Sequence, residues 1–255
     1  MLKTIFKYRV FIKHSTFAKL KIKNKGAIFG WLWWMLDPLI FMLIYYLLVV
    51  VIFKKGSNDY LLFVFLSLLP WRWFSTSLLE SGRSIRAQAG LIKKVYLPKV
   101  IFPIIPILSN TLSFFFGLLI LAILLALYKI QIGFNIIFFP YILIVQLLFG
   151  LGIGTILAHF NVYAKDTSNL LTHILRFWFF LSPGLYSINE VPSSILWLFK
   201  LNPFTILFTA YRNTILYNKM PDLFSLSILL CFSIGLMVIG FNLISKYEHN
   251  YAKIL

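Results

Sequence analysis

Residues 101–128 read IFPIIPILSNTLSFFFGLLILAILLALY, a run that carries no charged side chain. A helix that spans the hydrocarbon core of a bilayer needs about 20 mostly apolar residues. This run therefore predicts a transmembrane helix. Five further segments meet the same criterion, although the second contains Arg72 and the fifth contains Arg176 and Pro183. They are residues 28–53, 60–79, 135–160, 170–187 and 223–245. We therefore expect an all-α membrane protein with six transmembrane helices.

The composition of the whole chain supports this class. Of the 255 residues, 60% are hydrophobic and only 12% are charged, and the mean hydropathy is +0.89. A soluble domain carries about 25% charged residues and could not bury so much apolar surface. An ordinary cytosolic enzyme and a disordered chain are both excluded. The single cysteine, Cys231, rules out an internal disulfide and a cysteine-based metal site.

The charge is strongly positive, at +17 from 24 Lys and Arg against 7 Asp and Glu. The basic residues flank the apolar runs, so the positive-inside rule and anionic lipid headgroups explain them better than nucleic acid, which we do not expect as a partner. Seventeen of them fall on one side of the predicted spans and six on the other, with Arg72 inside a span. Both termini are therefore expected in the cytoplasm.

Residues 1–25 and 188–220 are neither spans nor simple loops. In the first, helical spacing places basic residues on one stripe with apolar residues beside it, which predicts an amphipathic helix on the cytoplasmic leaflet; the alternative is a disordered basic arm. Residues 26–255 then form one transmembrane domain. In 188–220, two short apolar runs flank Asn202-Pro203, which predicts a re-entrant hairpin in the outer leaflet. Two helices lying flat on the outer surface are the alternative.

The connection at 80–99 is the best candidate for a partner site. Residues 81–84 offer a helix N-cap, residues 85–91 can form a short helix, and Lys93-Lys94 precede Pro98. A short, basic, partly apolar helix can dock in a groove of a soluble subunit. A solvated basic loop is the competing interpretation.

Reactive groups show no recognisable catalytic pattern. The seven acids are dispersed, the histidines lack metal-ligand spacing, and no nucleotide-binding, zinc-protease or hydrolase motif is present. We therefore expect neither catalytic residues nor a metal. Only Arg72 lies deep in a span, so ion-coupled transport is disfavoured and a partner is expected to supply the energy.

Aromatic side chains gather around Arg72 and in the fifth span. Aromatic rings stack on the apolar C–H faces of sugars, so a polysaccharide channel would need such residues. The candidates for channel lining are Trp71, Arg72, Trp73, Phe74, Trp178 and Tyr186. Lipid-facing packing is the alternative for each of them.

Several stretches, in order along nearly the whole chain, resemble the membrane subunit of type-2 ABC exporters for polysaccharides, namely the O-antigen, capsule and teichoic acid permeases, and the O-antigen exporters most. The stretches are GWLWWMLDPL at 30–39, LPWRWF at 69–74, LIKKVYLPK at 91–99, NVYAKD at 161–166, SPGLY at 182–186, LNPF at 201–204 and YR at 211–212. Lys165 departs from the Arg that is usual in the family, and Lys lacks the planar fork of Arg.

The resemblance implies a half-transporter in the bacterial cytoplasmic (inner) membrane. Its expected partners are a second copy of itself, two copies of an ATP-binding cassette subunit that bind ATP and Mg, membrane lipids, and a glycan on undecaprenyl diphosphate. The implied coupling helix is about 81–91, and the implied ATPase contacts are Arg83, Ser84, Arg86, Gln88, Lys93 and Lys94. The lysines before the first span, Lys19, Lys21, Lys23 and Lys25, are expected to attract the diphosphate headgroup.

Three other functions remain open. A type-2 ABC permease for a drug or a small lipid would share the fold. A membrane glycosyltransferase would need convergent acids, which the sequence does not show. A scaffold protein would need no ATPase.

Overall fold

The computed structural model describes residues 6–24, 30–54, 56 and 59–255, and within these ranges every regular element is a helix. The elements are α2 (Arg9–Asn24), η1 (Gly30–Leu32), α3 (Trp33–Tyr46), η2 (Leu47–Ile52), α4 (Tyr60–Ala87), α5 (Ala89–Lys94), α6 (Ile101–Leu127), η3 (Phe134–Phe138), α7 (Phe139–Tyr163), α8 (Thr167–Phe180), η4 (Ile188–Glu190), α9 (Leu196–Leu201), α10 (Pro203–Ile215) and α11 (Leu223–Ile254). The all-α prediction is confirmed for this part of the chain.

Within the described part of the chain, four helical segments are long and apolar enough to cross a membrane: Tyr60–Lys94, Ile101–Leu127, Phe134–Tyr163 and Leu223–Ile254. The first predicted span corresponds to a shorter apolar helix, Leu36–Ile52. The fifth corresponds to α8, which has only 14 residues because the chain turns at 181–184, where Pro183 cannot donate to a helical hydrogen bond. Length and composition therefore support four of the six predicted spans.

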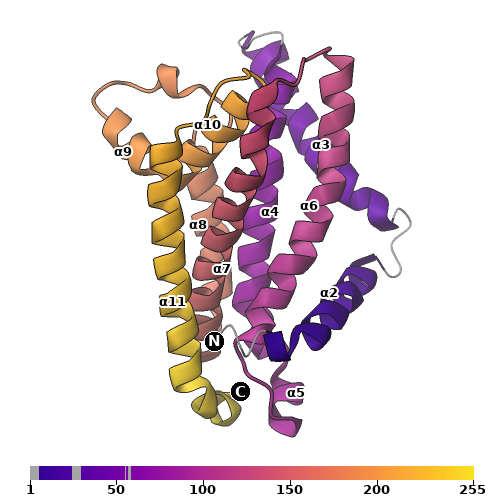
Figure 1. Cartoon of the computed structure of the whole chain (residues 1–255), viewed down its shortest axis with the longest axis vertical. Helices are drawn as coiled ribbons and strands as arrows, with labels where there is room; N and C mark the ends of the chain where they lie inside the picture. The colour runs from indigo at the N-terminus through magenta and orange to yellow at the C-terminus, as the bar shows by residue number, and fades with distance from the viewer. Residues whose placement is uncertain (1–5, 25–29, 55, 57–58) are drawn as a thin grey trace.

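The long helices lie side by side, with α4 in the interior (Figure 1). α4 packs against α6 on one side and α7 on the other, and α11 covers the far side of α7. Of the 28 residues of α4, 18 are buried. The largest hydrophobic cluster is built along its upper two thirds and takes in Leu62, Phe65 and Phe74.

The two ends of the bundle differ (Figure 1). α5, the start of α2 and the end of α11 lie at one end, whereas α9 and α10 lie at the other. The predicted break at Asn202-Pro203 is confirmed, because Asn202 Oδ1 accepts a hydrogen bond from Phe204 N (3.0 Å) and caps α10. α9 is mostly exposed, but α10 packs into the bundle against α4 and α7.

The helix of the N-terminal arm contacts the rest of the protein through one face. Ile12, Thr16 and Leu20 are buried, and α2 packs against α6. Phe6 and Phe17, which helical spacing places in the same apolar sector as Leu20, are exposed, so this part of the predicted apolar stripe does not pack on the protein. Residues 1–5 and 25 of the predicted helix lie outside the described residues.

The helix N-cap predicted at 81–84 is wrong. α4 continues through these residues to Ala87 and breaks only at Gln88. Ser81 Oγ donates to Pro103 O of α6 (3.0 Å) and Ser84 Oγ donates to Ser81 O (2.6 Å), so both hydroxyls are used in packing and in the helix. The separate short helix is α5, at Ala89–Lys94, rather than residues 85–91.

α7 and α11 approach closely because glycines remove side chains from their interface. A Cβ at Gly152 would lie 2.7 Å from Leu236 Cβ and 2.9 Å from the backbone nitrogen of Met237. A Cβ at Gly240 on α11 would clash with Thr155 Oγ1 of α7. Small residues of this kind let the backbones of transmembrane helices pack directly.

We predict that Gly152→Ala lowers the free energy of unfolding by about 1–3 kcal/mol, because the backbone of α11 would have to move. Gly235→Ala is the matched control, since a Cβ there meets nothing within 4 Å. Thermal unfolding of the purified chain in detergent measures both variants. Equal stability of the two would contradict the assigned α7–α11 contact.

Candidate functional site

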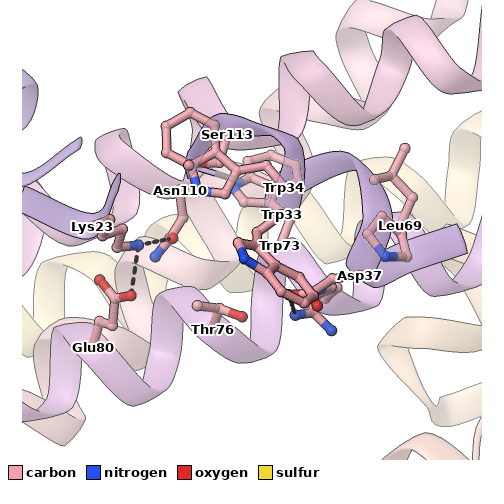
Figure 2. A pocket seen from close by; sticks show the side chains of 13 residues that line it. Lys23, Trp33, Trp34, Asp37, Leu69, Trp73, Thr76, Glu80, Asn110 and Ser113 are labelled. Atoms are coloured by element: carbon pink, nitrogen blue, oxygen red, sulfur yellow. Dashed lines mark hydrogen bonds and ion pairs between the residues drawn. The ribbon is translucent and has the colours of Figure 1, made fainter. Parts of the chain in front are cut away.

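One face of α4 carries the polar groups of the candidate site. Arg72, Thr76 and Glu80 are spaced by four residues, so they lie above one another on the helix. This face looks toward a cavity of about 350 Å³ between α2, α3, α4 and α6 (Figure 2). The cavity is lined by Lys23, Gly30, Trp33, Trp34, Asp37, Pro38, Leu69, Arg72, Trp73, Thr76, Glu80, Asn110 and Ser113. We call it the inner cavity.

Glu80 ties α2 to the bundle at one end of the inner cavity. Its two carboxylate oxygens pair with Lys19 Nζ (2.9 Å) and Lys23 Nζ (2.6 Å), which lie one helical turn apart on α2. Lys23 Nζ also donates to Asn110 Oδ1 on α6 (2.7 Å; Figure 2). Burial lowers the pKa of Lys23, and Glu80 opposes that shift. Lys23 thus joins α2 to both α4 and α6.

An ion pair between Arg72 and Asp37 closes the other end of the inner cavity and joins α4 to α3. The Arg72 guanidinium also lies 5.5 Å from the ring centroid of Phe41. Beyond the pair is a second cavity of about 250 Å³, which we call the aromatic cavity. It is lined by Pro38, Phe41, Tyr45, Leu68, Trp71, Arg72, Ser75, Arg176, Phe179 and Phe180. The ion pair therefore stands between two cavities.

The structure does not bring the six predicted channel residues together. Trp71, Phe74 and Trp178 pack around Phe204, with ring centroids 4.6, 4.6 and 5.4 Å from its own, and so belong largely to the protein core. Trp73 lines the inner cavity and stacks on Phe114.

Tyr186 lies apart from the other five. Its hydroxyl donates to Phe180 O (3.0 Å), and its side chain lines a separate cavity beside Tyr60. Of the predicted set, Trp71 and Arg72 line the aromatic cavity, while Arg72 and Trp73 line the inner one.

Sequence reasoning missed several residues that line the cavities. Asp37 and Glu80, treated as dispersed acids, line the same cavity at opposite ends, each paired with a cation. Asn110 was also missed, although a polar residue inside an apolar run is itself a signal of function. Phe179 and Phe180 of the aromatic cavity belong to the aromatic group of the fifth span but were not chosen as channel residues, and Phe41 carried no signal that separated it from other aromatic residues.

The lysines predicted to attract a headgroup do not share one environment. Lys19 and Lys23 face inward and pair with Glu80, whereas Lys21 is exposed on the opposite side of α2. The division follows from helical geometry, because residues two apart point in nearly opposite directions. Lys25 lies outside the described residues.

The residues predicted to contact the ATPase also differ in exposure. Arg83, Gln88, Lys93 and Lys94 are exposed at the end of the bundle that carries α5, and Ser84 is buried. Arg86 donates to Asn161 O (3.1 Å) and to Val162 O (2.7 Å), so it joins α4 to the end of α7. No group of three or more metal-ligating side chains occurs among the residues that the structure describes.

We predict that Glu80→Gln loosens α2. The substitution leaves two half-buried lysines without their counter-charge, and a loss of about 1 kcal/mol raises the open population about fivefold. Limited proteolysis with trypsin should then cleave after Lys19 and Lys23 about fivefold faster. Asp166→Asn, at an exposed acid before α8, is the matched control. Unchanged cleavage in Glu80→Gln would show that the ion pairs do not hold α2.

Comparison with known proteins places the chain in a family. The family described as ABC-2 type transporter matches residues 25–216. The chain is 28% identical over 255 residues to the O-antigen export system permease protein RfbA of Myxococcus xanthus, covering 99% of this chain and 98% of that protein. It is 27% identical over 237 residues to the RfbA permease of Klebsiella pneumoniae, covering 92% and 91%. The match spans far more than half of the chain, which therefore belongs to the ABC-2 transporter membrane family.

Proposed function

We propose that this chain is the channel-forming permease subunit of an ABC transporter that exports a lipid-linked polysaccharide of the O-antigen kind across the bacterial cytoplasmic membrane. The similarity to permeases named for O-antigen export, over nearly the full length of both chains, carries this proposal. The sequence holds no nucleotide-binding motif. ATP and Mg would therefore be bound by two copies of a partner subunit.

The proposed topology has six spans with both termini in the cytoplasm. α3 and η2 together run for about 30 Å at 1.5 Å per residue, which matches the hydrocarbon core. α8 and the turn after it form the fifth span. The excess of Lys and Arg assigns the cytoplasmic side to the end with α5 and the C-terminal part of α11.

We assign α9 and α10 to a re-entrant hairpin in the outer leaflet. Broken backbone is tolerated at membrane depth only where protein satisfies its polar groups. At the break, Asn202 Oδ1 accepts a hydrogen bond from Phe204 N (3.0 Å), and Asn202 Nδ2 donates to Leu181 O (3.2 Å). Arg212 on α10 donates to Pro183 O (2.7 Å), Gly184 O (2.7 Å) and Phe63 O (3.2 Å). These bonds attach the hairpin to the turn that ends α8 and to α4.

The channel would form between two copies of the chain, with the aromatic cavity in its wall. Phe41, Arg176 and Phe180 line this cavity and are exposed on the surface of the protomer, whereas the tryptophans of α4 are mostly buried. Exposed rings and cationic side chains can contact the apolar faces and hydroxyls of a passing glycan. The undecaprenyl diphosphate would approach from the basic cytoplasmic end, where Lys21 is exposed.

The competing functions are weaker on specific grounds. A permease for a drug or small lipid shares the family, but the curated relatives are named for O-antigen export. A membrane glycosyltransferase needs a free carboxylate, and both carboxylates of the inner cavity are paired with cations. A scaffold function is disfavoured by the match to the family described as ABC-2 type transporter.

We expect deletion of the gene to abolish the surface glycan and to leave the lipid-linked glycan inside the cell. A mild-detergent pull-down of the tagged chain should recover a P-loop ATPase in equal amount. Immunoblotting of surface glycan and mass spectrometry of the pull-down measure these outcomes. A normal surface glycan with altered drug sensitivity would favour the small-molecule permease, and absence of an ATPase would contradict transport by this family.

We also expect the double variant Arg83→Glu/Lys94→Glu to retain about tenfold less ATPase in the pull-down, since like charges at a docking surface disfavour association. Lys200→Glu/Lys219→Glu, at exposed lysines near the opposite end, provides the control with the same charge change. Equal ATPase retention by the two variants would remove α5 and its surroundings from the docking surface.

A further inference from the structure

We infer that the inner cavity binds a one- or two-sugar unit of the exported glycan, with Asn110 as its central hydrogen-bond donor; this inference rests on the proposed function. The cavity is separate from the aromatic cavity and reaches it only at Arg72 and Pro38. It would act as a side pocket of the channel wall within each protomer.

The unsatisfied amide of Asn110 is the observation that points to a ligand. Asn110 is 4% exposed and lines the cavity. Lys23 donates to its Oδ1, which fixes the orientation of the amide, and its Nδ2 has no hydrogen-bond partner in the described structure. A buried donor without an acceptor is costly. A ligand hydroxyl in the cavity would supply the acceptor.

The charges around the cavity favour a neutral polyol over a phosphate. Asp37 and Glu80 stand at its two ends, paired with Arg72 and with the α2 lysines. A diphosphate headgroup would bring its charge beside two carboxylates, and like charges repel. Sugar hydroxyls donate to carboxylates and accept from Lys23 and Asn110, so they can use both kinds of group.

The shape and the rings of the cavity also fit a sugar. Its volume of about 350 Å³ lies near the lower limit of ligand pockets, which range from about 300 to 1,000 Å³. Trp33, Trp34 and Trp73 line it together with these polar groups (Figure 2). Along α4 its lining extends from Leu69 to Glu80, about 16 Å at 1.5 Å per residue, which accommodates a short saccharide.

The test measures binding to the intact transporter, purified with its ATPase in lipid nanodiscs. The probes are oligosaccharides of one to three residues, released by mild acid from the surface glycan of the native cell. Saturation-transfer NMR titrations give their dissociation constants. Asn110→Asp keeps the size of the side chain and its contact with Lys23 but removes the donor, so we expect binding about tenfold weaker.

Two further variants make the result decisive. Asn110→Leu should also lose binding, and it reports on the site if the aspartate variant does not assemble. Asn189→Leu, at an exposed residue of η4, should bind as the unsubstituted transporter does. Absence of binding to the unsubstituted transporter, or equal binding by all variants, would overturn the inference.

Inorganic diphosphate serves as the competing probe. If it binds in an Asn110-dependent manner and the oligosaccharides do not, the cavity is a headgroup site and the inference fails. The proposed function would fail separately, because the surface glycan would then persist after gene deletion. A glycan that is lost on deletion but does not bind overturns the sugar site alone.

Discussion

The free-energy cost of burying polar groups in an apolar bundle determines which elements pack against α4. α4 lies in the interior, so the charged side chains along it that are not exposed need partners on neighbouring elements. Arg72 pairs with Asp37 of α3, Glu80 pairs with α2, and Arg86 donates to the carbonyls that end α7. At the other end of the helix, Ser67 accepts from Arg212 of α10. The polar residues of one helix thus specify which elements contact it.

This arrangement connects the two ends of the protein through a single helix. The end of α4 leads within two residues into α5, whose surroundings we propose as the ATPase contact. Higher on the same helix, Arg72 separates the inner from the aromatic cavity. A rigid shift of α4 would therefore change the ATPase-side surface, the attachment of α2 and the cavities together. Transport by a permease without a nucleotide site requires a connection of this kind.

The candidate site was only partly predictable. Arg72 stood out because it is a cation inside an apolar span, and the structure places it between two cavities. The surrounding tryptophans were less informative, since Trp71 and Trp178 pack in a buried aromatic cluster around Phe204. An aromatic residue suits a core, a lipid surface and a sugar site equally well. The lysines before the first span show the same ambiguity, because partners from distant helices decide the role of each charge.

The sequence by itself determined the class of protein, its excess of positive charge and the helix break at Asn202-Pro203. These properties depend on composition and on local residues such as Asn202-Pro203, whose effect on the backbone needs no distant contact. Only the tertiary structure decided which faces of the helices meet. α7 has no distinct apolar face, so no periodicity indicates its rotation. Close packing at Gly152 and the ion pairs of Glu80 and Arg72 join residues far apart in the chain, and their geometry exists only in the assembled bundle.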